Sequence, residues 1–140
     1  MKLRLDASLE RGSSVMVQTE SALHSVAERL SKARQVGLDT EFYRDDVYFP
    51  KLCLLQIAMD GEVALVDPLA LPGESPVFRR LLSKLPCEAI FHSAVGDFAA
   101  LEAAHMELPP LVFDTQMAAA FLGISRQIGY AALLEQCLHI

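Results

Sequence analysis

Residues 36–66, VGLDTEFYRDDVYFPKLCLLQIAMDGEVALV, are the stretch that decides the fold of this chain. Two apolar runs in it, at 36–42 and 52–59, are typical of strands with a buried face. The dipeptide Asp-Gly at 60–61 predicts a tight hairpin turn. Residues 63–66 are then expected to be the antiparallel partner of the second run. The stretch therefore predicts the centre of a β-sheet.

The segments on either side alternate between strand and helix patterns. Before the central stretch, the sequence predicts a short strand over 15–18 and a helix capped by Thr19 or Ser21. After it, the patterns predict a helix capped by Ser75 with Pro76 first and an apolar stripe of Phe78, Leu81, Leu82 and Leu85, a strand over 88–92, a helix over 96–105, a helix from Asp114 through Leu122, and a final helix with an inner stripe of Tyr130, Leu133, Leu134, Cys137 and Leu138. An opening hairpin followed by this alternation predicts an α/β fold with a mixed sheet flanked by helices.

Composition narrows the class of protein. The 140 residues are 52% hydrophobic, which suits one globular domain. No apolar run reaches the roughly 18 residues of a membrane span, and the charged start at 1–12 lacks the apolar core of a signal peptide. We therefore expect a cytoplasmic protein without membrane contact. Its three scattered cysteines, Cys53, Cys87 and Cys137, are expected to be reduced thiols of the core.

The net charge of -6 excludes a nucleic-acid-binding protein that relies on a broad basic face. It leaves open a site in which bound divalent cations reverse the sign of clustered carboxylates and so attract phosphate.

Asp39 and Glu41 are the residues most informative about chemistry. Side chains two positions apart on a strand point to the same face, so the two carboxylates are expected to project together. Like charges this close repel unless a cation lies between them, and Mg²⁺ and Mn²⁺ prefer oxygen ligands. The alternative is a pair of acids at a solvent-exposed strand end.

Asp97 is the second candidate, because it follows the strand pattern at 88–92 and falls in the first turn of the next helix. An acid there can simply interact with the helix dipole. In α/β sheets, however, strand ends and helix starts are where sites are built. Asp97 could therefore converge on Asp39 and Glu41 as a metal-binding cluster.

The order of these motifs resembles the ribonuclease D family of the DEDD exonuclease superfamily. Residues 39–70 are similar to the family's first motif region and residues 90–101, IFHSAVGDFAAL, to its second. Residues 112–123 and 128–138 resemble the two helical segments that follow. The resemblance implies an RNase H-like fold and hydrolysis of single-stranded RNA, with DNA as an alternative, from the 3' end by two Mg²⁺ or Mn²⁺ ions.

The resemblance also assigns roles to individual residues. Asp39, Glu41 and Asp97 are implied as catalytic, metal-binding carboxylates, and Thr40, Phe42 and His92 as residues that contact nucleic acid. Phe42 could equally be a core aromatic and His92 a hydrogen-bonded histidine at a strand end. Of two nearby polar residues, Gln56 is expected to satisfy a backbone group and Asp114 to cap a helix.

The family's fourth acid lies four residues after a Tyr in a later motif, and this sequence has no such pair; Tyr130 is followed four positions on by Leu134. We therefore expect a polar segment at 1–14 and a partial exonuclease domain at 15–140 that lacks the C-terminal part. Apolar surface is expected to be exposed there and covered by a second copy or a completing partner chain. A catalytically incomplete module that binds nucleic acid or protein is the alternative function.

Overall fold

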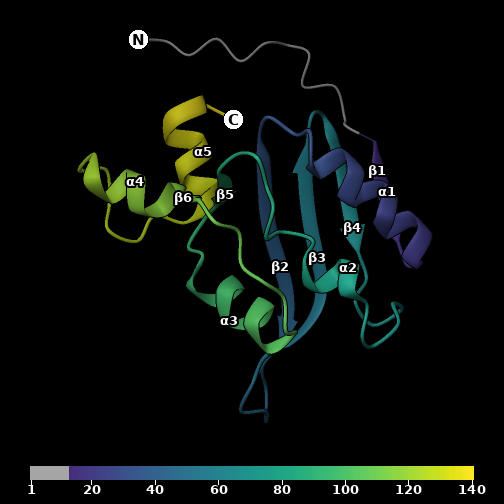
Figure 1. The fold of residues 1–140 in the computed structure, drawn as a ribbon. Helices are drawn as coiled ribbons and strands as arrows, with labels where there is room; N and C mark the ends of the chain where they lie inside the picture. Colours follow the sequence, from purple (N-terminus) through teal and green to yellow (C-terminus); the bar gives the residue numbers. More distant parts are fainter. Residues whose placement is uncertain (1–12) are drawn as a thin grey trace.

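The computed structural model describes residues 13–140, which form one six-stranded sheet in the order β1-β4-β3-β2-β5-β6 (Figure 1). The strands are β1 (Ser14–Val17), β2 (Val36–Tyr43), β3 (Lys51–Met59), β4 (Glu62–Val66), β5 (Ala89–Phe91) and β6 (Val112–Asp114). β3 is antiparallel to both of its neighbours, and the other pairs are parallel. The predicted mixed sheet and central hairpin are confirmed.

Five helices accompany the sheet: α1 (Glu20–Leu30), α2 (Pro76–Arg79), α3 (Val95–Ala103), α4 (Thr115–Phe121) and α5 (Tyr130–Leu138). Figure 1 shows α1, α2 and α3 on one face of the sheet, with α4 and α5 beyond the β5–β6 edge. Buried side chains of α1, α2 and α3 share a single core with the strands. The α/β architecture predicted from the sequence is therefore confirmed.

The two faces of the central strands differ in burial. On β2, Val36, Leu38 and Thr40 are buried, whereas Asp39 and Glu41 on the opposite face are exposed. The same alternation holds on β3, where Leu55 and Ile57 are fully buried and Ala58 is exposed. This strand period of two turns the acid pair away from the core.

Side-chain caps begin the helices where the sequence predicts. Thr19, rather than Ser21, accepts a hydrogen bond from Ala22 N at the start of α1. Ser75 accepts one from Phe78 N at the start of α2, with Pro76 in the first position. The second helix is shorter than its apolar stripe suggests.

The chain beyond α2 continues as successive turns in which an N–H bonds the carbonyl three residues back, up to Leu85. Pro86 follows and disfavours helical backbone at the residue before it. Leu81, Leu82 and Leu85 are nevertheless buried, so the stripe packs as expected without a continuous helix.

Two expectations about the C-terminal part are wrong. Strand β6 was not predicted, because it has only three residues and follows the Pro109-Pro110 pair that suggests a break. The stripe of α5 is not buried: no residue of this helix is, and Tyr130 and Cys137 are exposed. Helical spacing predicts which residues share a face, but not whether anything covers that face.

The cysteine expectation is also wrong in part. Cys53 and Cys87 are half-buried and Cys137 is exposed, and all three are free thiols. Within residues 13–140, no helix is long and apolar enough to cross a membrane. The polar segment predicted at 1–14 falls almost wholly outside the described residues, and the cytoplasmic location stays a prediction.

Candidate functional site

Strand β2 presents its acid pair on the open face of the sheet. Asp39 and Glu41 are both exposed there, as the spacing predicts, while Thr40 between them is 7% exposed on the opposite face. The register with β3 shifts directly after Glu41, where Cys53 is left without a partner. A bulge of this kind bends the strand and re-aims nearby side chains. The acid pair therefore sits where β2 departs from regular pairing.

Asp97 is attached to the middle residue of this segment. It lies in the first turn of α3 and is 7% exposed. Its Oδ1 accepts hydrogen bonds from Thr40 N at 3.1 Å and from Thr40 Oγ1 at 2.6 Å. The structure thus brings the acid of the second motif next to the acid pair of the first, from an element 57 residues away.

The parallel pairing of β5 with β2 explains this position. β5 runs beside the first residues of β2, and α3 begins four residues later, alongside the next part of β2. Phe98 of α3 packs edge-on against Phe91 of β5, with ring centroids 5.4 Å apart.

Gly96 permits close packing in the first turn of α3, since an added Cβ would lie 3.3 Å from the Phe42 ring. Phe42 is half-buried and packs on the core, which fits the core-aromatic interpretation. Its contact with nucleic acid stays a prediction.

The surroundings of Asp97 favour its neutral form. Burial raises the pKa of this carboxyl most, and the charge of Asp39 raises it further. The two hydrogen bonds from Thr40 lower the pKa but do not outweigh these causes. A cation beside Asp97 would favour the ionised form instead.

Gln56 holds Asp39 from the neighbouring strand. The two residues are direct cross-strand partners, and Gln56 Nε2 donates to Asp39 Oδ2 at 3.0 Å. The expectation that Gln56 satisfies a backbone group is therefore wrong. Its only sequence signal is a polar residue in an apolar run. The bulge after Glu41, which the sequence did not predict, changes the register that aligns Gln56 with Asp39.

His92 is a structural link, as its alternative interpretation held. Its Nδ1 lies 2.8 Å from Thr115 Oγ1 and its Nε2 lies 2.9 Å from the Ile128 carbonyl oxygen, so both ring nitrogens have partners. The ring also packs edge-on against Tyr130. His92, Tyr130, Asp39 and Gln56 line a hollow of about 560 Å³ on the open face of the sheet.

Asp114 caps α4, as predicted, and also holds the turn before α3. It accepts from Gln116 N and Met117 N of the helix, and from Ser93 N and Ala94 N of the turn. Partial burial acts to raise the pKa of Asp114, but the four backbone donors outweigh it and lower the pKa. Ser93 has a φ of 66°, a strained conformation that these bonds stabilise.

The donor atoms suit a hard cation. Among the described residues, Glu41 and Asp39 Oδ1 have no hydrogen-bond donor, so carboxylate oxygens remain available. Over residues 13–140, however, no three His, Cys, Asp or Glu side chains are close enough together to hold a metal ion. The convergence of Asp39, Glu41 and Asp97 on a cation therefore stays a prediction.

Comparison with known proteins identifies close relatives. The family model for 3'-5' exonucleases matches residues 14–140. Ribonuclease D of Zymomonas mobilis is 38% identical over 127 residues, which cover 89% of this chain and 32% of that protein. Ribonuclease D of Haemophilus influenzae is 40% identical over 126 residues, covering 89% and 31%. The crystal structure of Escherichia coli RNase D matches with a TM-score of 0.83 at 30% identity, over 91% of this chain and 34% of that chain. The chain spans about a third of the length of these relatives.

Replacing Thr40 by Val should raise the pKa of Asp97 further. The change removes the hydroxyl that donates at 2.6 Å, which stabilises the ionised carboxylate, and keeps the side-chain shape. A metal-free NMR titration of the Asp97 carboxyl carbon measures this, with Thr40→Ser, which retains the hydroxyl, as the matched control. An unchanged or lower pKa in Thr40→Val would contradict the assignment of this bond.

Proposed function

The chain belongs to the ribonuclease D family of 3'-5' exonucleases, and on that premise we propose that it hydrolyses single-stranded RNA from the 3' end. Asp39, Glu41 and Asp97 are the catalytic carboxylates in this proposal. The observation that carries it is the contact of Asp97 with Thr40, because it brings an acid from a distant element to the segment between the other two.

Divalent metal ions are general cofactors of this superfamily, and we assign Mg²⁺ or Mn²⁺ to the three carboxylates. Their available oxygens and mutual repulsion suit a hard cation. When bound, such ions activate a water molecule and stabilise charge on the leaving 3' oxygen. The chain's own contribution is orientation: Gln56 holds Asp39, and Thr40 holds Asp97.

RNA is the proposed substrate because Escherichia coli RNase D, 30% identical in the matched region, is described as an exoribonuclease involved in structured RNA processing. Phe42, half-buried at the end of β2, is proposed to contact the terminal base through its ring. Thr40 supports the site by positioning Asp97. His92 supports it by its contact with Thr115, because both residues line the hollow beside Asp39. DNA is the alternative substrate.

A second candidate function is binding without hydrolysis. It is favoured by the lack of a three-residue metal group within residues 13–140 and of a Tyr followed four positions on by Asp in this sequence. In our proposal, full turnover requires a fourth carboxylate from outside these 140 residues, and the three carboxylates alone support slow hydrolysis. A weak cation site formed by Asp39, Glu41 and Asp97 is then expected even before completion.

Asp39→Asn should abolish hydrolysis. The variant removes a carboxylate charge from the cation site, and we expect shortening of a 5'-labelled single-stranded RNA in Mn²⁺ to slow by about 100-fold or more. A matched DNA substrate tests the alternative. The control is Asp60→Asn, which makes the same change in the β3–β4 turn. RNA binding without shortening by the unaltered chain would support the second candidate function.

Gln56→Leu should weaken Mn²⁺ binding by about 10-fold, because a residue that orients a metal-binding carboxylate typically contributes that much to affinity. Calorimetry with the metal alone measures this without any need for activity. Gln18→Leu is the matched control, since Gln18 Nε2 donates to Asp67 Oδ2 at 3.1 Å in an equivalent amide–carboxylate bond elsewhere. Equal Mn²⁺ affinities of Gln56→Leu and the unaltered chain would remove Gln56 from the site.

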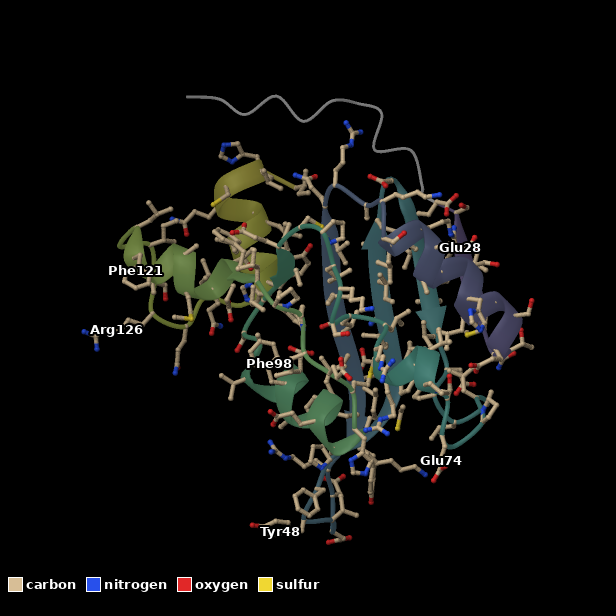
Figure 2. The ribbon with its side chains drawn as sticks, in the orientation of Figure 1. Glu28, Tyr48, Glu74, Phe98, Phe121 and Arg126 are labelled. Atoms are coloured by element: carbon tan, nitrogen blue, oxygen red, sulfur yellow. The ribbon has the colours of Figure 1, made fainter. Side chains whose placement is uncertain are left out.

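The exposed apolar side chains of α4 should drive self-association. Figure 2 shows Phe121 at the outer end of this helix, where it is 87% exposed beside the exposed Leu122. We propose that a second copy covers this surface, as exposed apolar clusters commonly mark interfaces. Sedimentation velocity should show dimers or larger species that Phe121→Glu converts to monomer, while Tyr48→Glu does not. A monomer at all concentrations would contradict this.

A further inference from the structure

A second groove lies at the end of the sheet that carries the β2–β3 loop. It has a volume of about 800 Å³ and is formed by the start of β3, the loop at 68–75, α2 and the C-terminal end of α3. Figure 2 shows Tyr48 at the tip of the β2–β3 loop and Glu74 on the neighbouring loop. None of the proposed catalytic carboxylates lines this groove, so it requires its own explanation.

The groove carries more positive than negative groups. Lys51 and Arg79 line it together with His105, an N–H donor in either protonation state, and Glu74 is the one acid among its lining residues. Lys51, Arg79 and His105 are exposed, and none forms an ion pair within the described part of the chain. In a chain of net charge -6, this local excess favours an anionic ligand.

The groove also has an exposed aromatic wall. Phe49 lines it while 69% exposed, and its ring lies 4.8 Å from that of Tyr48, which is 92% exposed. Two adjacent, exposed aromatic rings beside cations suit a ligand that combines phosphates with flat bases. A purely anionic ligand would have no use for the Phe49 ring.

The backbone beneath two of the cationic residues is held in place. Glu107 N donates to the Arg79 carbonyl oxygen at 2.8 Å, which ties the end of α3 to α2. His105 adopts a φ of 58° in the turn that ends α3. Glycine is preferred in this left-handed conformation, and an imidazole there costs free energy that glycine would not.

The groove begins close to the acid pair. Lys51 is the cross-strand partner of Tyr43, which lies two residues after Glu41. Along the strand direction, Lys51 is therefore roughly 7 Å from the position of Glu41. Helix α3 also connects them, with Asp97 in its first turn and His105 just beyond its last. The acid pair lies on the open face of the sheet and the groove beside α2 and α3, so a ligand that occupies both has to pass around the end of the sheet at the β2–β3 loop.

We propose that this groove binds single-stranded RNA on the 5' side of the nucleotide at the acid pair. Lys51, Arg79 and His105 contact phosphates, and Phe49 stacks on a base. The inference rests on the proposed function, because it takes the ligand to be the same RNA strand. It adds a binding subsite whose residues are distinct from those that hold the cation.

The test is fluorescence anisotropy with labelled single-stranded RNAs of about 4 and about 16 nucleotides, the range of lengths that such grooves bind. EDTA in the buffer prevents hydrolysis. Lys51→Ala and Arg79→Ala should each weaken binding of the longer RNA about fivefold and reduce the slope of log affinity against log salt by roughly 0.7 per lost phosphate contact. Binding of the shorter RNA, which contacts fewer phosphates, should weaken less.

Phe49→Ala should weaken binding of the longer RNA by about 10-fold, the loss expected for one stacked base. It should leave the binding of inorganic polyphosphate unchanged, because polyphosphate offers charge without bases. The matched control is Lys32→Ala, which removes an exposed cation near the start of β2, at the opposite end of that strand. Circular dichroism of each variant verifies that it is folded.

Three outcomes would overturn the subsite: the long RNA binds all three groove variants as well as the unaltered chain, Phe49→Ala weakens polyphosphate as much as RNA, or the unaltered chain does not bind the long RNA at low salt. A protein ligand is indicated if RNA fails to bind. The proposed function is decided separately by Asp39→Asn. If that variant loses hydrolysis while the groove variants bind the long RNA as well as the unaltered chain does, the groove is overturned and the proposed function is not.

Discussion

The hydrogen bonds from Thr40 to Asp97 are the interaction on which the candidate site depends. Burial of an ionised carboxylate costs several kcal/mol, whereas a hydrogen bond to a charged group returns about 1.5–3 kcal/mol. The cost of burial is the larger of the two, because the pKa of Asp97 is raised despite both bonds. A carboxyl whose pKa is higher in the folded state contributes stability below its unfolded pKa and loses that contribution as pH rises through the folded value. Ionised Asp97 therefore costs the folded chain free energy, and a bound cation would offset it.

The open face of the sheet gives the acid pair access to a cation and leaves apolar surface exposed at the same time. Helices α1, α2 and α3 bury one face, but α5 has no buried residue and α4 ends in exposed Phe121 and Leu122. Helices α4 and α5 both lie beyond the edge where β5 and β6 extend the sheet (Figure 1). The stability of this region therefore rests more on polar links than on packing. His92 and Asp114 supply them, each joining chain segments at least 20 residues apart.

Local chemistry made much of this arrangement predictable. The Asp60-Gly61 turn, the Thr19 and Ser75 caps and the alternation along β2 depend on neighbouring residues, and each was found as expected. What the sequence could not provide are the contacts that depend on long-range register. Gln56 faces Asp39 only because the loop at 44–50 sets the offset between two strands, and β6 forms only because β5 offers it an edge. The position of Asp97 was predicted in outline, whereas its bonds to Thr40 require the actual placement of α3.

Electrostatics couples the two sites of the proposed function. Asp39, Glu41 and Asp97 without a cation repel phosphate, and so does the chain as a whole at a net charge of -6. Long-range attraction cannot concentrate RNA on such a surface, so binding has to come from short-range contacts and from divalent ions. In the proposed binding mode, the groove near Lys51 supplies the short-range contacts through its cations and its aromatic wall. Divalent ions supply the other contribution, since an acid pair that repels phosphate attracts it once such ions are bound. RNA that spans both sites brings phosphate charge to the carboxylates, which strengthens cation binding, and by linkage the cation strengthens RNA binding by the same factor.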